Sequence, residues 1–268
     1  MQWSDLERKV AEHTGAAMIE YLSEPLAVSM GEQWFEIAAM DHFWVVRRFH
    51  VLQALGGEII GNAKEIGEVG CGNGLLQRQI EIGYARGVTG LDLNEYALKR
   101  NVSARSRVCC YDIRDRKPEF AGSFDLIFLF DVLEHITDEY AFIEAVLFHL
   151  TRNGKIIINV PAGQWAFSSY DRTVGHLRRY DIKSLRAVAR QTGLTIAEWT
   201  YWGLPLMPIL AIRKVWLTMQ RGRDRDLIIR KGFDTRVQWL NEALGLLCRF
   251  ESVPQKMAGS SLMAVMER

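Results

Sequence analysis

A glycine-rich loop at residues 68–74, EVGCGNG, is the first segment of this sequence whose residue types suggest chemistry. It carries Gly70, Gly72 and Gly74, and it stands between a short apolar run and a segment of helix-like pattern. Glycines let the backbone approach a ligand closely, and the N-terminus of a helix offers unbonded N–H groups. The loop therefore predicts a cofactor site. Its GxGxG spacing lacks the third glycine of a dinucleotide-binding GxGxxG loop, which argues against NAD.

Two aspartates follow at the ends of the next strand-like runs. Asp92 is placed to accept hydrogen bonds from both hydroxyls of a ribose, as an acidic residue does at this point in nucleotide-binding folds. Asp112 stands beside Ile113, so a carboxylate and an apolar side chain could hold the amino group and the ring face of an adenine. These strand ends agree with the cofactor site that the glycine loop predicts.

Acidic and imidazole side chains gather in the segment DVLEH at residues 131–135. On a helix, positions i, i+3 and i+4 share a face, so Asp131, Glu134 and His135 can converge at the carboxyl end of the sheet, where ligands bind. Further along, His176 lies in the segment GHLRRY. Because an imidazole can accept a proton near neutral pH, His176 is the best candidate base, and His135 is a second candidate catalytic residue.

The elements that must position these residues alternate between strand-like and helix-like segments. Short apolar runs recur from about residue 65 to 160, separated by segments of helix length with apolar residues at spacings of three and four. This alternation predicts βαβ units and a doubly wound parallel α/β sheet. The runs are Glu65–Gly70, Gly87–Asp92, Arg107–Tyr111, Phe124–Phe130 and Gly154–Val160, and connecting helices are expected at Leu75–Ala85 and Asp138–Leu150.

Further elements flank this core. Helices are predicted at Ser4–Leu22 and Asp41–Leu55, and strands at Leu194–Tyr201 and Ser261–Met266. A long stretch of helical pattern separates the last two strands, which indicates one sheet with an insertion and no second domain. We therefore expect a single domain over residues 1–268. Its parts are an N-terminal helical lid (1–56), a cofactor-binding core (57–201), a helical insertion (202–258) and a last strand (259–268).

Composition limits the classes of function. Of 268 residues, 49% are hydrophobic and 24% are charged, and the formal net charge is +1, so the chain has no global field for binding nucleic acid. The four cysteines have no CxxC spacing, and the charged N-terminus lacks an apolar signal core. The longest uncharged apolar run, residues 201–212, is shorter than the ~20 residues that span a bilayer. We expect a cytoplasmic protein with reduced thiols, either monomeric or homodimeric.

Five motifs in order resemble those of the class I S-adenosylmethionine-dependent methyltransferases, specifically their small-molecule branch. They are EVGCGNG, the GLD that ends at Asp92, the CYDI that ends at Ile113, FDLIFLFDVLEHI, and LTRNGKIIINVP. The closing segment GSSLMAV is similar to the last strand of that family. The resemblance implies a Rossmann-like, seven-stranded, mostly parallel sheet with an antiparallel last strand, and S-adenosylmethionine as cofactor.

The resemblance also implies a role for each cofactor-binding residue. The three loop glycines would pack under the methionine part, Glu68 would contact its amino group, and Arg48 would pair with its carboxylate. The full implied set is Arg48, Glu68, Gly70, Gly72, Gly74, Asp92, Leu93, Asp112, Ile113 and Phe130. Alternatives remain for three of them: Glu68 as a cap of the loop, Asp112 as a surface acid, and Arg48 on a solvated helix face.

The DVLEH segment has two interpretations. In ubiquinone-biosynthesis O-methyltransferases and small-RNA 2′-O-methyltransferases, a similar Glu-x-x-Glu-His segment holds a divalent metal that polarises the acceptor hydroxyl. This chain has Asp131 in the first place, and metal-free relatives also carry DVLEH. We expect a role at a helix start and no metal.

The GHLRRY segment is similar to the GHxRxY segment that lies over the acceptor pocket of methyltransferases from saccharide, lipid and natural-product pathways. With aromatic residues of the two lid segments, the expected acceptor-binding set is Trp44, Tyr170, Arg178, Tyr180 and Trp202. The alternative is that His176 and Tyr180 only fix the loop and that the aromatic residues belong to the core. Basic residues in the insertion suggest peripheral contact with a membrane or lipid through residues 202–231, with a solvated face or a dimer contact as the alternative.

The expected function is methyl transfer from S-adenosylmethionine to a small molecule, at an oxygen of an apolar, lipid, saccharide or natural-product metabolite. N- or C-methylation is one alternative, and a non-catalytic subunit that binds a partner is another. Because a sulfonium is already activated, the protein is expected to contribute mainly in-line positioning, with proton removal where the nucleophile is a hydroxyl or an ammonium.

Overall fold

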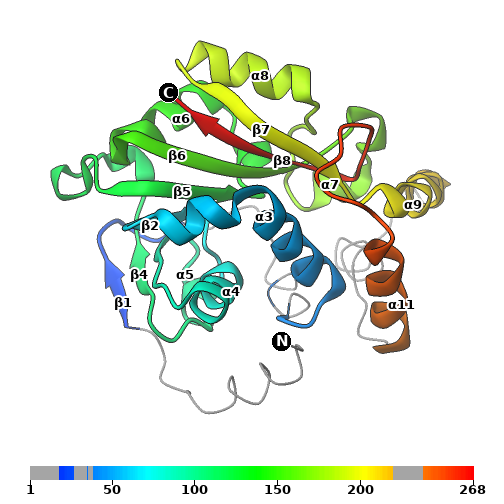
Figure 1. The fold of residues 1–268 in the computed structure, drawn as a ribbon, viewed down its shortest axis with the longest axis horizontal. Coiled ribbons are helices and arrows are strands. Elements are labelled where there is room, and N and C mark those ends of the chain that lie inside the picture. Colours follow the sequence, from blue (N-terminus) through cyan, green and yellow to red (C-terminus); the bar gives the residue numbers. More distant parts are fainter. Residues whose placement is uncertain (1–17, 27–34, 36–38, 220–237) are drawn as a thin grey trace.

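One sheet of eight strands is the centre of the fold (Figure 1). The computed structural model describes residues 18–26, 35, 39–219 and 238–268. The strand order is β1-β4-β3-β2-β5-β6-β8-β7, and neighbouring strands are parallel except that β8 runs antiparallel to both β6 and β7. The strands are β1 (Ile19–Tyr21), β2 (Ile66–Val69), β3 (Thr89–Asp92), β4 (Arg107–Cys110), β5 (Phe124–Phe130), β6 (Leu150–Pro161), β7 (Thr195–Trp202) and β8 (Ser261–Glu267).

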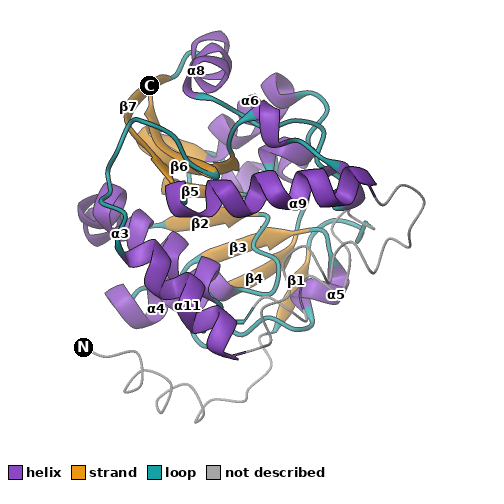
Figure 2. Cartoon of the chain, turned by 90° about the vertical axis from the view of Figure 1, so that its right-hand side faces the viewer, coloured by secondary structure: helices purple, strands orange, loops and turns teal. Residues whose placement is uncertain are grey.

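Helices cover both faces of the sheet, which gives three layers (Figures 1 and 2). One face packs against α6 and α8 through a core that includes Ile143 and Leu185, and the other packs against α3 and α4 through Leu52 and Ile80. The helices are α3 (Phe43–Asn62), α4 (Leu75–Tyr84), α5 (Glu95–Leu98), α6 (Glu139–His149), α7 (Ser169–Thr173), α8 (Ile182–Gln191), α9 (Met207–Met219) and α11 (Gln238–Arg249). Coverage of both faces is the reason why central strands such as β5 read as continuous apolar runs.

The predicted doubly wound α/β sheet with an antiparallel last strand is confirmed. The five core strands, the two flanking strands and the helix of residues 41–55 are all present, with shifted ends. The helix begins at Phe43 and continues to Asn62, and β6 begins at Leu150, before the predicted Gly154. Element ends depend on caps and pairing partners more than on periodicity.

The predicted helix Ser4–Leu22 is wrong at its C-terminal end. Ile19–Tyr21 form strand β1, which pairs in parallel with β4, so the sheet has eight strands where seven were expected; residues 1–17 lie outside the described residues. Helical periodicity is a local signal, whereas pairing with the edge of β4 satisfies backbone groups that would otherwise face solvent. The two hydrogen bonds from Arg107 to the Glu20 carboxylate, at 2.9 and 2.6 Å, support this pairing.

Trp202, at the end of β7, belongs to the core. Its side chain is 0% exposed, its ring lies 5.5 Å from the Trp44 ring, and its Nε1 donates a hydrogen bond of 2.9 Å to Oδ1 of Asn159. A side chain without exposed surface has no face left for an acceptor. In this structure Trp202 is therefore a core residue, which was the alternative to the expected acceptor-binding role.

We expect Trp202→Ala to lower the free energy of unfolding by ~3–5 kcal/mol, because it removes a large buried side chain and leaves a cavity. Chemical denaturation measures the change. Trp239→Ala is the matched control: Trp239 is 69% exposed, so its removal should change the free energy of unfolding little. Equal effects in the two variants would contradict the placement of Trp202 in the core.

Candidate active site

A cavity of about 210 Å³ lies at the carboxyl ends of β2, β3 and β5. This is the edge of a doubly wound sheet at which ligands bind. The cavity is lined by Phe35, Trp44, Val45, Arg48, Glu68, Gly70, Cys71, Gly72, Asn73, Leu75, Leu76, Asp92, Phe130, Asp131, Val132, His135 and Ile136. Many of the residues singled out from the sequence therefore meet in one place, although they come from five separate segments.

The glycine loop forms the floor of the cavity because its backbone must turn sharply there. Gly70 and Gly72 have φ of 78° and 53°, in the left-handed region that favours glycine. A Cβ on Gly70 would lie 2.4 Å from Cγ2 of Val132, and a Cβ on Gly72 would lie 3.0 Å from the ring of Phe35. Any other residue would fill the space beside the loop. Gly74, which precedes α4, lies just outside the lining.

Glu68 places a buried carboxyl group at the cavity. Its exposed fraction is 3%, and its Oε2 has no hydrogen-bond partner among the described residues. Burial raises the pKa of Glu68 to about 8, although the positive charge of Arg48 acts in the opposite direction. A buried polar atom without a partner costs free energy, so a ligand with a hydrogen-bond donor or a positive charge would be favoured here.

Asp92 ties the glycine loop to the end of β3. Its Oδ2 accepts a hydrogen bond of 2.7 Å from the backbone N–H of Gly72, and its Oδ1 accepts one of 2.8 Å from that of Asn94. Burial raises the pKa of Asp92, and these backbone bonds counteract the effect. The carboxylate thus fixes the loop and also reaches the cavity.

Asp112 and Ile113 lie outside the cavity lining, as does Leu93. The Asp112 carboxylate accepts hydrogen bonds from Nε and Nη2 of Arg114, at 2.9 and 2.6 Å. Ile113 is buried in the core beneath. Sequence reasoning did not consider Arg114 as the partner of Asp112.

Arg48 places a guanidinium group at the cavity. Its guanidinium lies 4.7 Å from the centre of the Trp44 ring and 5.2 Å from that of Phe130, and its Nη1 donates a hydrogen bond of 2.7 Å to Oδ2 of Asp131. Asp131 has a φ of 58°, and its Oδ1 accepts a hydrogen bond of 2.8 Å from Nδ2 of Asn159. Arg48 is therefore paired inside the protein and does not lie on a solvated helix face.

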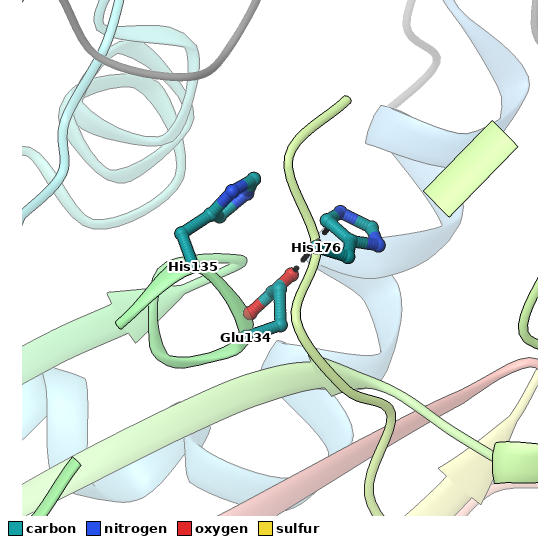
Figure 3. Close-up of side chains that lie close together, drawn as sticks. All are labelled: Glu134, His135 and His176. Atoms are coloured by element: carbon teal, nitrogen blue, oxygen red, sulfur yellow. Dashed lines mark ion pairs between the residues drawn. The ribbon is translucent and has the colours of Figure 1, made fainter. Parts of the chain in front are cut away.

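The expected convergence of Asp131, Glu134 and His135 on one helical face is wrong. Only Leu133–His135 are helical, in a single 3₁₀ turn, and Asp131 turns away to Arg48. The structure instead brings Glu134 and His135 together with His176 (Figure 3); one ligand atom of each lies within 4.8 Å of those of the others. Such a set of donors could hold a divalent cation.

Glu134 is the buried acid of this cluster. It is 0% exposed, and neither carboxyl oxygen has a hydrogen-bond partner among the described residues. Burial and the charge of Asp131 raise the pKa of Glu134 well above its ordinary value. Burial and the proximity of His176 lower the pKa of His135 to about 4. At neutral pH His135 is therefore neutral, and burial favours the protonated form of Glu134 over the ionised one.

His176 does not line the cavity itself but packs against His135, which does. Its ring centre is 4.8 Å from that of His135, which does line the cavity, and its Nε2 is 3.8 Å from Oε1 of Glu134. On the other side, Nδ1 is 3.0 Å from Oδ1 of Asp171. Asp171 is a functional candidate that sequence reasoning missed, although the sequence places it five residues before His176.

Three expected acceptor residues hold the loop to its surroundings. Tyr180 donates a hydrogen bond of 2.6 Å to Oε2 of Glu139, and Nη1 of Arg178 donates one of 2.7 Å to the same oxygen. Tyr170 is buried beneath the guanidinium of Arg213, and burial raises the pKa of Tyr170 to about 12. These contacts correspond to the loop-fixing alternative. Of the expected acceptor set, Trp44 is the residue that lines the cavity.

Known proteins similar in sequence to this chain are methyltransferases. Residues 67–158 match the family described as methyltransferase domain. Over 100 residues the chain is 30% identical to a ubiquinone biosynthesis O-methyltransferase of Marinobacter nauticus, covering 34% of this chain and 42% of that protein. Over 168 residues it is 29% identical to a protein of the same name from Chromobacterium violaceum, covering 56% of this chain and 71% of that one. The chain thus matches less than half the length of the first of these relatives.

Solved structures share the fold. A methyltransferase dependent on S-adenosylmethionine from Archaeoglobus fulgidus has a TM-score of 0.57 and 13% identity, covering 88% of this chain and 97% of that one. Phosphoethanolamine N-methyltransferase 2 from Haemonchus contortus, in complex with S-adenosyl-L-methionine, has a TM-score of 0.56 and 15% identity. The match covers 89% of this chain and 57% of that one. At these identities the likeness concerns the fold alone.

The cavity residues fit a cofactor that carries an amino group and a ribose. Glu68 offers a buried carboxyl oxygen that has no hydrogen-bond partner in the described part of the chain, the glycine loop leaves space that a Cβ would fill, and Asp92 stands at the next strand end. The site, the matched domain, the sequence relatives and the shared fold agree. The chain carries a methyltransferase domain at residues 67–158 on the fold of S-adenosylmethionine-dependent methyltransferases, and S-adenosylmethionine is the cofactor that its cavity residues fit.

Proposed function

We propose that this chain transfers a methyl group from S-adenosylmethionine to a hydroxyl of a small, largely apolar acceptor. The observation that carries the proposal is the 210 Å³ cavity, in which the glycine loop, Glu68 and Asp92 meet the aromatic side chains of Trp44 and Phe130. Support for oxygen as the accepting atom comes from the relatives named ubiquinone biosynthesis O-methyltransferase. Methylation at nitrogen or carbon is the alternative acceptor chemistry.

The protein residues have distinct roles in this proposal. Glu68 binds the amino group of the cofactor, Asp92 binds its ribose, and Arg48 exchanges its bond to Asp131 for one to the cofactor carboxylate. Asp112 and Ile113 would hold the adenine, beyond the lining of the cavity. Bound there, the cofactor supplies a sulfonium methyl group that is already activated, so the side chains need mainly to align the acceptor oxygen with it. His176 would take the proton of the acceptor hydroxyl as the C–O bond forms and the C–S bond of the sulfonium breaks, with the demethylated cofactor as the leaving group.

Incubation with labelled S-adenosylmethionine and a metabolite extract tests the function directly. We expect one class of apolar, hydroxyl-bearing metabolite to gain a methyl group, identified by mass, and the label to stay unincorporated with heat-denatured protein. Label on an amine or a carbon would contradict the choice of oxygen. Binding of S-adenosylmethionine with no labelled product in any extract would favour the non-catalytic, partner-binding alternative.

We expect Asp92→Ala to weaken the binding of S-adenosylmethionine by ~1–3 kcal/mol, because the ribose hydroxyls lose their acceptor. Titration calorimetry measures the affinity. Asp125→Ala is the matched control, because Asp125 also accepts backbone N–H bonds, from Lys64 and Glu65, but does not line the cavity. An unchanged affinity in Asp92→Ala would remove Asp92 from the site.

We expect methyl transfer to survive exhaustive chelation of divalent metals. Metal ligands must be deprotonated, whereas the pKa of Glu134 is raised well above its ordinary value, and Asp131 is already bound to Arg48. Turnover before and after chelation measures this. Activity lost to the chelator and restored by Mg²⁺ would contradict the expectation and identify Glu134, His135 and His176 as the ligands.

Peripheral contact with lipid through the insertion is a second part of the proposal. Helices α9 and α11 lie on the same side of the molecule (Figure 2), and none of the described helices is long and apolar enough to cross a membrane. Both helices expose large apolar side chains. These are Ile209, Ile212 and Val215 on α9, and Trp239, Leu246 and Leu247 on α11. These apolar side chains suit an interface with lipid, and the sequence of the insertion is also rich in basic residues, of which those at 221–231 lie outside the described residues.

We expect the protein to float with vesicles that contain anionic lipid, and the double variant Ile212→Glu with Val215→Glu to lose this binding, because two charges would enter the apolar contact. Flotation at two salt concentrations measures it. Val102→Glu is the control, because Val102 is also an exposed apolar residue but is distant in sequence from α9 and α11. Vesicle binding that survives the double variant would refute contact through α9.

A further inference from the structure

We propose that Asp171 is a positioning residue for His176: it fixes the imidazole as the tautomer that carries its proton on Nδ1 and keeps the lone pair on Nε2. The inference rests on the proposed function, in which His176 takes the proton of the acceptor. Asp171 touches neither the cofactor cavity nor the reacting atoms, and it acts through the histidine.

The contacts of Asp171 make its carboxylate an acceptor only. Its Oδ1 accepts a hydrogen bond of 2.7 Å from Nε of Arg179, and its Oδ2 accepts one of 2.8 Å from the backbone N–H of Ser168. Both donors hold hydrogens that do not dissociate at neutral pH. Asp171 is 0% exposed, and its hydrogen bond with His176 and the charge of Arg179 lower its pKa. An ionised carboxylate cannot donate, so the 3.0 Å contact requires a hydrogen on Nδ1 of His176.

The backbone of the same loop keeps the imidazole in place. The N–H of His176 donates a hydrogen bond of 2.7 Å to the carbonyl of Asp171, and the N–H of Leu177 donates one of 2.8 Å to the carbonyl of Glu134. The side chain of His176 is 12% exposed. The ring is therefore held by its own loop on one side and by the turn that carries Glu134 and His135 on the other.

The tautomer decides whether His176 can act as a base. With hydrogen on Nδ1, Nε2 is the nitrogen that can accept a proton, and it points toward the Glu134 carboxyl at 3.8 Å. That separation is too long for a hydrogen bond, and one oxygen atom between the two groups would be within hydrogen-bond distance of both. Neither group lines the cavity, so an acceptor would have to reach that position past His135, which does. An acceptor hydroxyl at that position would give its proton to Nε2, and the Asp171 carboxylate would stabilise the imidazolium that results.

Asp171 also has a structural role, which the test must separate from the proposed one. It is the third residue of α7 and forms a capping box with Ser168. Loss of a cap alone would loosen α7 without selecting between the two tautomers of His176. The tautomer is therefore the measurement that a purely structural role does not move.

Nitrogen-15 NMR of histidine-labelled protein measures the tautomer without any acceptor. His176→Gln assigns the signals by their loss. We expect the wild-type protein, at a pH where His176 is neutral, to show hydrogen on Nδ1 and a bare Nε2. We expect Asp171→Asn to raise the share of the form with hydrogen on Nε2, because the charge that holds the Nδ1 hydrogen is gone. A wild-type His176 with hydrogen on Nε2, or an unchanged tautomer in Asp171→Asn, would overturn the inference.

Two further variants keep the test decisive. Asp171→Asn combined with Arg179→Gln avoids a buried guanidinium without a counter-charge, in case the single variant fails to fold. Asp181→Asn is the matched control, because Asp181 forms the capping box of α8 with Ser184 and has no described histidine contact. A tautomer change in Asp181→Asn equal to that in Asp171→Asn would also overturn the inference.

A different experiment tests the proposed role of His176 as the base. Once an acceptor is known, His176→Ala should lower kcat by ~10²-fold, the usual contribution of a general base, and Asp171→Asn should lower kcat with an unchanged KM for S-adenosylmethionine. A wild-type rate in His176→Ala refutes the base, whereas the tautomer tests Asp171 by itself. The two failures are therefore distinguishable.

Discussion

The carboxylate of Asp131 is the constraint on which the site depends. At the end of β5 it is only 20% exposed, and it is stabilised there by Arg48 of α3 and Asn159 of β6. Asn159 in turn accepts the hydrogen bond of Trp202 from β7. One acidic residue thus connects α3, two strands of the core and the strand that leads into the insertion. The position of Arg48 above the cofactor cavity follows from this network.

Buried acids near the cavity fall into two groups with opposite electrostatics. Glu68 and Glu134 are buried with carboxyl oxygens that lack hydrogen-bond partners among the described residues, and burial raises the pKa of both. Asp171 is equally buried, but Arg179 and the backbone N–H of Ser168 hold it ionised. The hydrogen bonding of Glu68 and Glu134 is incomplete among the described residues until a ligand binds. The hydrogen bonding of Asp171 is complete, so its carboxylate can support a neighbouring histidine.

In the segment of residues 168–180, some polar side chains attach the segment to the core and others face the site. Tyr180 and Arg178 bind Glu139 of α6, which fastens the loop to the core. His176, from the same few residues, is turned toward Glu134 and His135. The attachment to Glu139 fixes the backbone of this segment, and a fixed backbone is required for a well-defined position of the His176 imidazole.

The sequence by itself determined the features that depend on neighbouring residues. Apolar runs that alternate with helical segments indicated the doubly wound sheet, and the glycines of residues 68–74 marked the loop whose φ values exclude most side chains. Parallel strands end at one edge, so the position of Asp92 beside that loop also followed from the order of the elements.

Only the tertiary structure decided which partner each buried group takes. Residues 19–21 follow a helical pattern but pair with β4; Asp131 turns to Arg48, and His176 joins Glu134 and His135. The partners of a buried charge come from segments that are distant in the chain, and the free energy of burial depends on the whole set. Local periodicity carries no information about that set, which is why the contacts of Asp171 and Asn159 were found in the structure and not in the sequence.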